Sequence, residues 1–258
     1  MNENECLNTQ FELLKGLFFD DRFETDEYIL CTSKTIDDHF WNLAFIKNRV
    51  NDEVLSEIEN KLHSINRGSC IYIGTSNDNY EYNKNYLLEK GYEVCDSDTY
   101  MVLDSKKDID INIDIKDVET IDEYNDFMDT LSSAYNDSEE NPDENVYAGS
   151  ITKCYYDAVK NTIGSKEHVH VIAYDNGTPV SVATLSFANG ICGVNSVGTR
   201  QGYWNKGYGK QLIAYIIKKC EEMGIKTLLL STEYHSKNQQ FYEKLGFKVI
   251  YVMEQFTK

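Results

Sequence analysis

The chain has 258 residues, which is enough for one large domain or two modest ones with cores of their own. Its formal net charge of −18 argues against nucleic-acid phosphate as a general partner. The polar N-terminus and the lack of any run of about 18 apolar residues predict neither a secretory signal nor a membrane span. Seven cysteines without a C-x-x-C pair favour reduced thiols and a cytoplasmic location.

The N-terminal part is expected to form a smaller α/β domain over residues 1–106. Its apolar spacing predicts two helices and two strands. The helices span residues 51–65 and 80–90, and the strands span residues 70–75 and a segment that ends near Leu103. A polar join at Lys106-Lys107-Asp108 separates this part from a second domain, residues 107–258.

The second domain is expected to begin with a strand, two helices and a region rich in hairpins. The predicted elements are a strand at 109–115, helices at 120–135 and about 146–162, and strands at 169–174, 178–187 and 191–199. Asn176-Gly177 and Asn189-Gly190 are strong signals for the tight turns between these last strands. His168 and His170 alternate on a strand without an evident third ligand, so no metal site is predicted.

A turn rich in glycine and lysine follows residues 191–199 and precedes an amphipathic helix. Gly207, Gly209 and Lys210 stand where this helix begins. The first N–H groups of a helix lack intrahelical partners and carry partial positive charge, so they readily bind an anion. Glycine lets a phosphate approach the backbone closely, and Lys206 adds charge. The turn therefore predicts a phosphate-bearing ligand.

Two common phosphate-binding motifs do not fit this turn. A nucleotide P-loop needs lysine where Tyr208 stands. A dinucleotide fingerprint needs a third glycine where Leu212 stands.

The chain after this helix adds a strand, a short helix and a last strand. Residues 227–231 form the strand, and Ser236 with Gln239 forms a capping box that starts the helix. The chain resembles the GNAT superfamily of acyl-CoA-dependent N-acyltransferases over roughly its last 150 residues. The resemblance rests on Trp204-Asn205-Lys206-Gly207-Tyr208-Gly209, followed by Asn238, Tyr242 and Gly246-Phe247. Trp204 departs from the family pattern, which has Gln or Arg at that position.

The resemblance implies an α/β fold with a mostly antiparallel central sheet flanked by helices. It implies an N-acetyltransferase that moves the acetyl group of acetyl-CoA to a primary amine by direct attack in a ternary complex. Tyr242 is implied as the acid for the leaving thiolate, although it could instead be a core aromatic packed behind Phe247. The implied cofactor contacts are Val197, Gly198, Thr199, Asn205, Lys206, Gly207, Tyr208, Gly209, Lys210 and Asn238.

The general base is not assigned from the sequence. Many family members have a glutamate on the strand before the loop, but residues 190–199 contain none. Glu233 and His235 are candidates without a firm role. This gap and Trp204 keep two alternatives open: an acyl-CoA-binding regulatory domain or pseudo-enzyme without turnover, and an interaction protein that uses the fold as a scaffold. The resemblance also allows a homodimer.

Charge is distributed unevenly along the second domain. Residues 108–148 carry fourteen acids and one base, whereas residues 149–258 carry eight acids and thirteen bases. The glycine-lysine turn therefore lies in the basic part, as a polyanionic cofactor requires. An acidic loop is expected either to favour a small cationic amine as acceptor or only to keep the protein soluble. Its acids are Asp137, Glu139, Glu140, Asp143 and Glu144.

The N-terminal part resembles a degenerate copy of the C-terminal half of the second domain. CIYIGTS and NYLLEKGYEV echo TLLLST and QFYEKLGFKV. Aligning Gly91 with Gly246 places Asn83 on Asn238 but Leu87 on Tyr242. Chance similarity between two helix-glycine-strand units is the alternative. In either case we expect a packing platform and no chemistry in this part.

Overall fold

A computed structural model of the chain describes residues 3–136 and 153–258. The chain forms two compact units, of which unit 1 comprises Met1–Val102 and Ser231–Lys258, and unit 2 comprises Leu103–Leu230. Each unit combines helices with strands, which confirms the predicted α/β class. The expected division at residue 106 assigns the whole C-terminal part to the second domain, whereas the segment Ser231–Lys258 belongs to unit 1. It lies in unit 1, because β11 (Phe247–Thr257) pairs with β4 (Cys70–Gly74).

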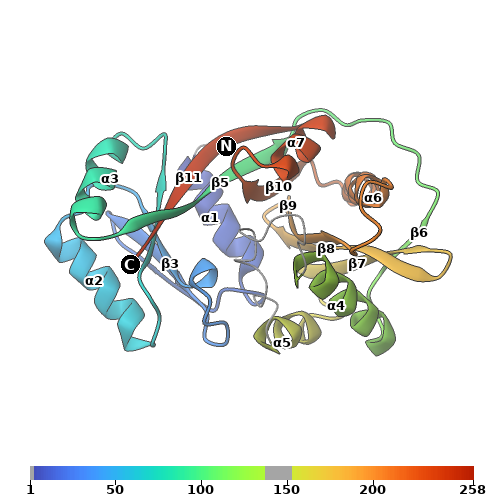
Figure 1. Cartoon of the computed structure of the whole chain (residues 1–258), viewed down its shortest axis with the longest axis horizontal. Helices are drawn as coiled ribbons and strands as arrows, with labels where there is room; N and C mark the ends of the chain where they lie inside the picture. The colour runs from blue at the N-terminus through green and yellow to red at the C-terminus, as the bar shows by residue number, and fades with distance from the viewer. Residues whose placement is uncertain (1–2, 137–152) are drawn as a thin grey trace. The chain divides into compact units, whose positions relative to one another are not determined.

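Unit 1 contains six strands and the helices that cover them (Figure 1). β2 pairs antiparallel with β1 and β3, β3 pairs parallel with β4, and β4 pairs antiparallel with β11. The remaining elements are α1 (Glu3–Leu14), β1 (Asp21–Glu24), β2 (Tyr28–Thr32), η1 (His39–Trp41), β3 (Leu43–Ile46), α2 (Asp52–Ser64), α3 (Tyr80–Glu89), β5 (Glu93–Leu103) and α7 (Lys237–Lys244).

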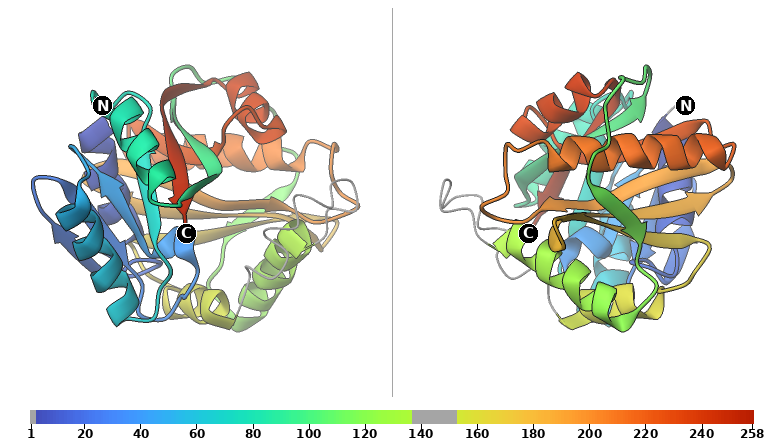
Figure 2. Two further views of the ribbon diagram at one scale, coloured as in Figure 1. Left: turned by 60° about the vertical axis from the view of Figure 1, so that its left-hand side comes forward. Right: turned by 90° about the vertical axis from the view of Figure 1, so that its right-hand side faces the viewer.

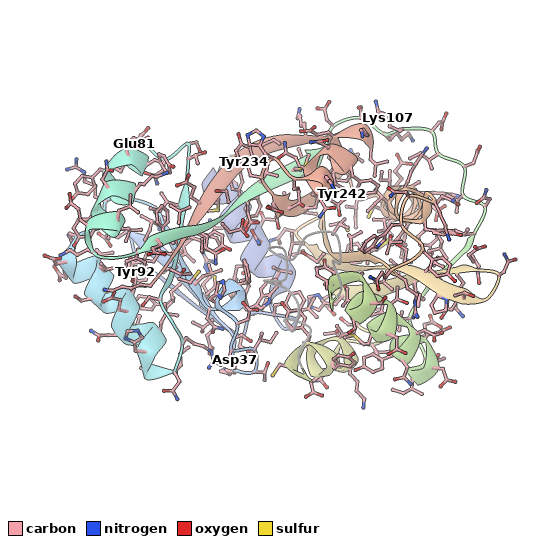
Figure 3. All side chains as sticks on the ribbon, viewed as in Figure 1. Asp37, Glu81, Tyr92, Lys107, Tyr234 and Tyr242 are labelled. Carbon is pink, nitrogen blue, oxygen red and sulfur yellow. The ribbon has the colours of Figure 1, made fainter. Side chains whose placement is uncertain are left out.

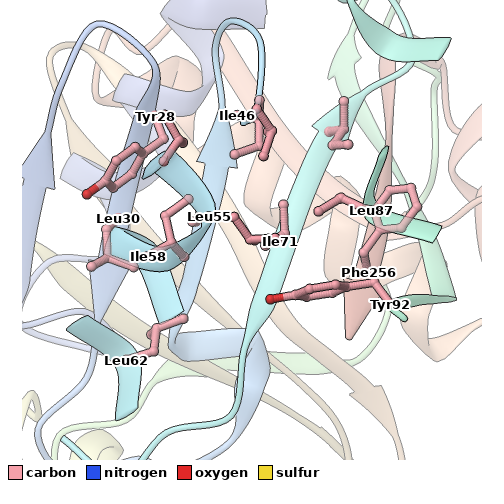
Figure 4. Packing of buried hydrophobic residues seen from close by; sticks show 14 residues of the cluster. Tyr28, Leu30, Ile46, Leu55, Ile58, Leu62, Ile71, Leu87, Tyr92 and Phe256 are labelled. Carbon is pink, nitrogen blue, oxygen red and sulfur yellow. The ribbon is translucent and has the colours of Figure 1, made fainter. Parts of the chain in front are cut away.

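The core of unit 1 lies between this sheet and α2 with α3 (Figure 4). α2 begins at the N-cap Asn51, whose side chain accepts a hydrogen bond from the Val54 N–H group, and it buries one apolar stripe. Ile58, Ile71 and Phe256 are fully buried in this cluster. The predicted helices and strands of residues 51–103 are confirmed, because local capping and apolar spacing agree with the tertiary contacts.

Unit 2 is a mixed sheet in which antiparallel pairs dominate. β6, β7, β8 and β9 pair antiparallel in chain order, and β9 pairs parallel with β10. The elements are β6 (Asp114–Asp117), α4 (Ile121–Asn136), α5 (Lys153–Asn161), β7 (His168–Asp175), β8 (Thr178–Ala188), β9 (Ile191–Thr199), α6 (Tyr208–Glu222) and β10 (Thr227–Glu233). The chain passes into unit 1 within β10.

Helices cover both faces of the sheet of unit 2. α6 lies over one face and α4 over the other, as Figure 2 shows. α4 buries Phe127, Met128 and Leu131 against β7 and β8. Both predicted turns are confirmed: Asn176 and Asn189 have φ of 50°, and the glycine after each also has positive φ.

One predicted element differs from the structure, and the start of another lies outside the described residues. The strand expected at 109–115 is β6, which begins only at Asp114. Asp114 pairs with Tyr174 close to the β7–β8 turn, so residues before Ile113 lie beyond the end of their partner strand. The helix expected at about 146–162 is α5, which is described from Lys153 to Asn161, and residues 146–152 lie outside the described residues.

No helix within residues 3–136 and 153–258 combines the length and the apolar character that crossing a membrane requires.

Candidate functional site

The end of β9 leaves its neighbour β10. The β9–β10 ladder runs from Ile191 to Gly193 on β9, and in the described part of the chain it stops there, although β9 continues to Thr199. On its other side, β9 carries a bulge between Asn195 and Gly198. Ser196 in this bulge has φ of 51°, which is rare for a residue other than glycine, asparagine or aspartate. On the side of β10, the last residues of β9 therefore pair with no other strand in the described part of the chain.

The loop after β9 ends in an uncapped helix start. Gly207 is the N-cap of α6 with φ of 85° and provides no side-chain cap. Its carbonyl accepts from the Gln211 N–H group at 3.1 Å. Within the described residues, the N–H groups of Tyr208, Gly209 and Lys210 have no acceptor, so they are available to an anion.

Trp204 closes the loop onto the strand before it. Its indole Nε1 donates to the backbone oxygen of Thr199 at 2.7 Å. Tyr208 at the start of α6 donates from its hydroxyl to the Asp175 carboxylate in the β7–β8 turn. Lys206 Nζ lies 4.6 Å from the centre of the Tyr203 ring. These contacts hold the loop by its aromatic side chains. The role of residues 205–210 as cofactor contacts stays a prediction.

Gly198 is required by packing. A Cβ atom at this position would lie 2.8 Å from the Ala134 Cβ atom on α4. The neighbouring Val197 oxygen accepts from the Tyr135 hydroxyl at 3.3 Å, and burial raises the pKa of Tyr135 to about 12. α4 therefore contacts the bulge of β9 directly, which the sequence did not reveal.

Tyr242 and Asn238 lie on α7 in unit 1. Tyr242 is labelled in Figure 3. The helix starts as predicted, because Ser236 accepts from the Gln239 N–H group at 3.0 Å. Asn238 is exposed, whereas Tyr242 is 7% exposed and meets the Phe247 ring edge-on at 5.8 Å between centroids. Tyr242 thus has the packing contact that the sequence offered as an alternative, and its catalytic role stays a prediction.

Glu233 and His235, the candidate bases at the end of β10 and just after it, have local structural contacts. His235 has φ of 60°, and its N–H group donates to the Gln239 side chain at 2.7 Å. Its ring lies 3.8 Å from that of Tyr234, between centroids. Glu233 accepts from the Ser236 hydroxyl through its backbone oxygen at 2.7 Å, and its side chain stays exposed. Neither residue gains an assignment from these contacts.

Asp98 on β5 is a titratable residue that the sequence analysis did not single out. Burial, reinforced by the nearby Asp96 carboxylate, raises the pKa of Asp98 to about 7. The Tyr72 hydroxyl donates to it at 3.3 Å. Only the three-dimensional contacts between strands distinguish Asp98 from the other acids of its segment.

His168 and His170 are held by hydroxyl groups. His170 contacts Thr162 Oγ1 and Thr184 Oγ1, both at 2.9 Å, and His168 Nδ1 lies 3.1 Å from Ser186 Oγ. Burial lowers the pKa of His170 to about 4. Residues 3–136 and 153–258 contain no group of three ligands suited to a metal ion.

A cavity of about 640 Å³ in unit 2 is lined by β6, the start of α4 and the β7–β8 turn. Its lining includes five carboxylates, Asp114, Asp122, Glu123, Asp126 and Asp175, together with Lys116. Lys116 binds Glu123 at 2.7 Å and holds the pKa of that carboxyl at about 2. A lining of this charge repels phosphate and attracts cations. The acidic loop of Asp137, Glu139, Glu140, Asp143 and Glu144 lies outside the described residues.

The predicted similarity between the N-terminal part and the C-terminal half of the second domain extends to the order of the elements. β2, β3, α2, β4, α3 and β5 follow the same order as β8, β9, α6, β10, α7 and β11, with an antiparallel pair and then a parallel crossover in each. In unit 1, however, the β3–β4 ladder continues to Ile46, the last residue of β3. Buried Asn83 accepts from the Val50 N–H group and donates to the Asn48 oxygen. The first series therefore uses this asparagine for its own backbone.

Comparison with known proteins identifies one family. Residues 124–247 match the model of the acetyltransferase (GNAT) family. The structure is similar to a GCN5-related N-acetyltransferase from Kribbella flavida, with a TM-score of 0.70, 14% identity, and coverage of 98% of this chain and 94% of that chain. A GCN5-related N-acetyltransferase from Sphaerobacter thermophilus gives a TM-score of 0.59 and 12% identity, with coverage of 98% and 84%.

A conserved protein of unknown function from Staphylococcus epidermidis is similar to the same extent. It gives a TM-score of 0.66 and 15% identity, and the match covers 95% of this chain and 96% of that chain. At such identities the likeness to solved structures concerns the fold. No curated protein sequence matches this chain.

Proposed function

Because this protein belongs to the GNAT superfamily and is an acyltransferase, we propose that it transfers the acetyl group of acetyl-CoA to a primary amine. The amine attacks the thioester directly in a ternary complex, and the proposed acceptor is a small cationic amine. The new bond joins the amine nitrogen to the acetyl carbon, and the broken bond joins that carbon to sulfur. The amine loses a proton, and the coenzyme A thiolate gains one.

One observation carries the proposal: in the described part of the chain the first N–H groups of α6 have no acceptor, and the loop before them follows the end of β9, where the β9–β10 ladder has stopped. N–H groups at a helix start suit a diphosphate. A strand edge that no neighbouring strand covers within residues 3–136 and 153–258 suits the amides of the pantetheine arm, which can pair with it as an added strand would. Gly207 and Gly209 keep the approach to the backbone open. Val197, Gly198 and Thr199 supply the strand backbone.

Catalysis in this proposal depends mainly on alignment and on backbone donors. An N–H group of the β9 bulge placed at the thioester oxygen would contribute a few kcal/mol to transition-state stabilisation. Orientation of the amine against the thioester contributes the larger share. Tyr242 is proposed as the acid for the thiolate and Asn238 as a contact of the pantetheine arm. Both assignments rest on the family resemblance.

The charge of unit 2 supports a cationic acceptor. The carboxylates of the cavity outnumber its single lysine, and their field raises the local concentration of cations. Amines that carry several positive charges are therefore the first class to screen.

The proposal is tested by titrating acetyl-CoA calorimetrically and by measuring thiol release with a panel of amines. Binding with turnover on at least one amine supports the proposed enzyme. Binding without turnover on any amine favours the regulatory or pseudo-enzyme alternative. Gly209→Trp should abolish binding by covering the backbone at the helix start, while Gly68→Trp is the control in unit 1. Retained micromolar affinity in Gly209→Trp would refute the assignment of the loop.

A further inference from the structure

The loop carries neither Gln nor Arg at the position where the resemblance places one of them. Trp204 stands there, and its only polar atom, Nε1, is used by the Thr199 oxygen. Tryptophan carries no charge, so this position adds nothing to the attraction of a diphosphate. A cation elsewhere on the same loop could restore that attraction.

Arg200 is such a cation. It follows β9 directly, and its backbone N–H group donates to the Val180 oxygen at 2.9 Å. Its own carbonyl accepts from the Tyr203 N–H group at 3.0 Å, so Arg200 begins the turn that leads to Trp204. The backbone of Arg200 is therefore fixed at both ends, next to the end of β9.

Within residues 3–136 and 153–258, the guanidinium of Arg200 has one hydrogen-bond partner. One terminal nitrogen, Nη2, donates to Thr130 Oγ1 at 3.3 Å, and Nε is buried without an acceptor. Among the described residues no carboxylate pairs with it, although the chain carries 43 acids. A guanidinium has five N–H donors in a planar fork that suits two oxygens of a phosphate. Among the residues that the structure describes, only Nη2 has an acceptor.

Two further cations near the loop, like Arg200, have no carboxylate partner among the described residues. Lys206 and Lys210 are exposed, and neither pairs with a carboxylate within residues 3–136 and 153–258. In the same unit, by contrast, Lys116 and Lys219 bind Glu123 and Asp117 at 2.7 Å. Cations that are left without acids in an acidic protein indicate a surface that receives an anion.

We propose that Arg200 binds the diphosphate of coenzyme A and so replaces the side-chain contact that Trp204 cannot make. The inference rests on the proposed function, because it concerns the same cofactor. Thr130 orients one edge of the guanidinium, and the other donors meet phosphate oxygens as charge-assisted hydrogen bonds.

Calorimetric titration of coenzyme A into the wild type, Arg200→Gln, Arg200→Lys and Arg49→Gln tests the inference. Arg49 is a matched control, because it lies over the Tyr82 ring in unit 1. Arg200→Gln should weaken binding about ten- to a hundred-fold, since a hydrogen bond to a charged group is lost. Arg200→Lys should lose less, and Arg49→Gln should bind like the wild type. Unchanged melting temperatures would show that all variants fold.

Titrations of dephospho-coenzyme A and kinetics with the acceptor show which anion Arg200 contacts: the diphosphate, the 3′-phosphate or a carboxylate of the acceptor. Dephospho-coenzyme A keeps the diphosphate, so Arg200→Gln should weaken its binding by the same factor. Dephospho-coenzyme A binding that is insensitive to Arg200→Gln would overturn the inference in favour of the 3′-phosphate. An unchanged affinity for coenzyme A with a raised KM for the acceptor would overturn it in favour of an acceptor carboxylate. A wild type that binds no coenzyme A would instead refute the proposed function itself.

Discussion

The indole Nε1 of Trp204 lies 2.7 Å from the backbone oxygen of Thr199 and donates a hydrogen bond to it. This bond joins two residues that are five positions apart and closes the first part of the loop between β9 and α6. It gives Trp204, which departs from the family pattern, a structural role, because it holds the loop against the strand that precedes it. The loop geometry therefore depends on a side chain rather than on backbone turns alone.

Trp204→Phe should weaken coenzyme A binding several-fold while leaving the fold intact. The substitution keeps the aromatic contact and removes the N–H donor, and a net hydrogen bond contributes about 1 kcal/mol. Titration calorimetry measures the effect, with Trp41→Phe in unit 1 as the control. Equal affinities in the two variants would show that the bond does not shape the binding loop.

Gly198→Ala should destabilise the protein by about 1–3 kcal/mol, as overpacking usually does. The added methyl group would lie 2.8 Å from the Ala134 Cβ atom, and α4 would have to shift. Urea denaturation gives the free energy of unfolding. Gly68→Ala is the control, because nothing lies within 4 Å of its added Cβ atom. Ala134→Gly alone should cost about 1 kcal/mol, because glycine disfavours a helix interior. The double variant Gly198→Ala with Ala134→Gly should therefore be more stable than the sum of the two single losses predicts, and strict additivity would contradict the proposed clash.

Tyr242→Phe should lower kcat much more than it weakens cofactor binding. The phenol is the proposed acid, whereas its ring keeps the contact with Phe247 in the variant. A thiolate is a fair leaving group, so we expect a loss of about ten- to a hundred-fold rather than complete inactivity. Thiol-release kinetics measure kcat, and Tyr82→Phe on the exposed face of α3 is the control. An unchanged kcat would remove Tyr242 from the catalytic assignment.

His170 should make the protein less stable in acid. Its pKa is about 4 in the folded protein, below its ordinary value of about 6.5, because burial disfavours the charged ring. The unfolded chain therefore binds a proton first as the pH falls. The contribution to stability is complete above about pH 6.5 and is lost progressively towards pH 4, by up to a few kcal/mol.

Urea denaturation between pH 7 and pH 4 measures this dependence. His170→Gln keeps hydrogen-bonding capacity for Thr162 and Thr184 but does not titrate, so its stability should fall less steeply over this interval. An identical slope in the wild type and His170→Gln would assign the acid sensitivity to other groups.

The sequence by itself determined the elements whose bonds are local. The Asn-Gly pairs fixed both hairpin turns, because asparagine and glycine tolerate positive φ. Ser236 and Gln239 set the start of α7, and the glycine-lysine turn set the start of α6. The family resemblance followed from these local features together with the spacing of Asn238 and Tyr242.

Only the tertiary structure decided where strands stop pairing and which distant residues meet. The end of the β9–β10 ladder at Gly193, the bulge at Ser196 and the contact of Gly198 with α4 have no local signal. The late start of β6 and the place of residues 231–258 in unit 1 likewise follow from partner strands far along the chain. Pairing register and close packing are set by contacts between remote segments, whereas caps and turns are set by neighbouring residues.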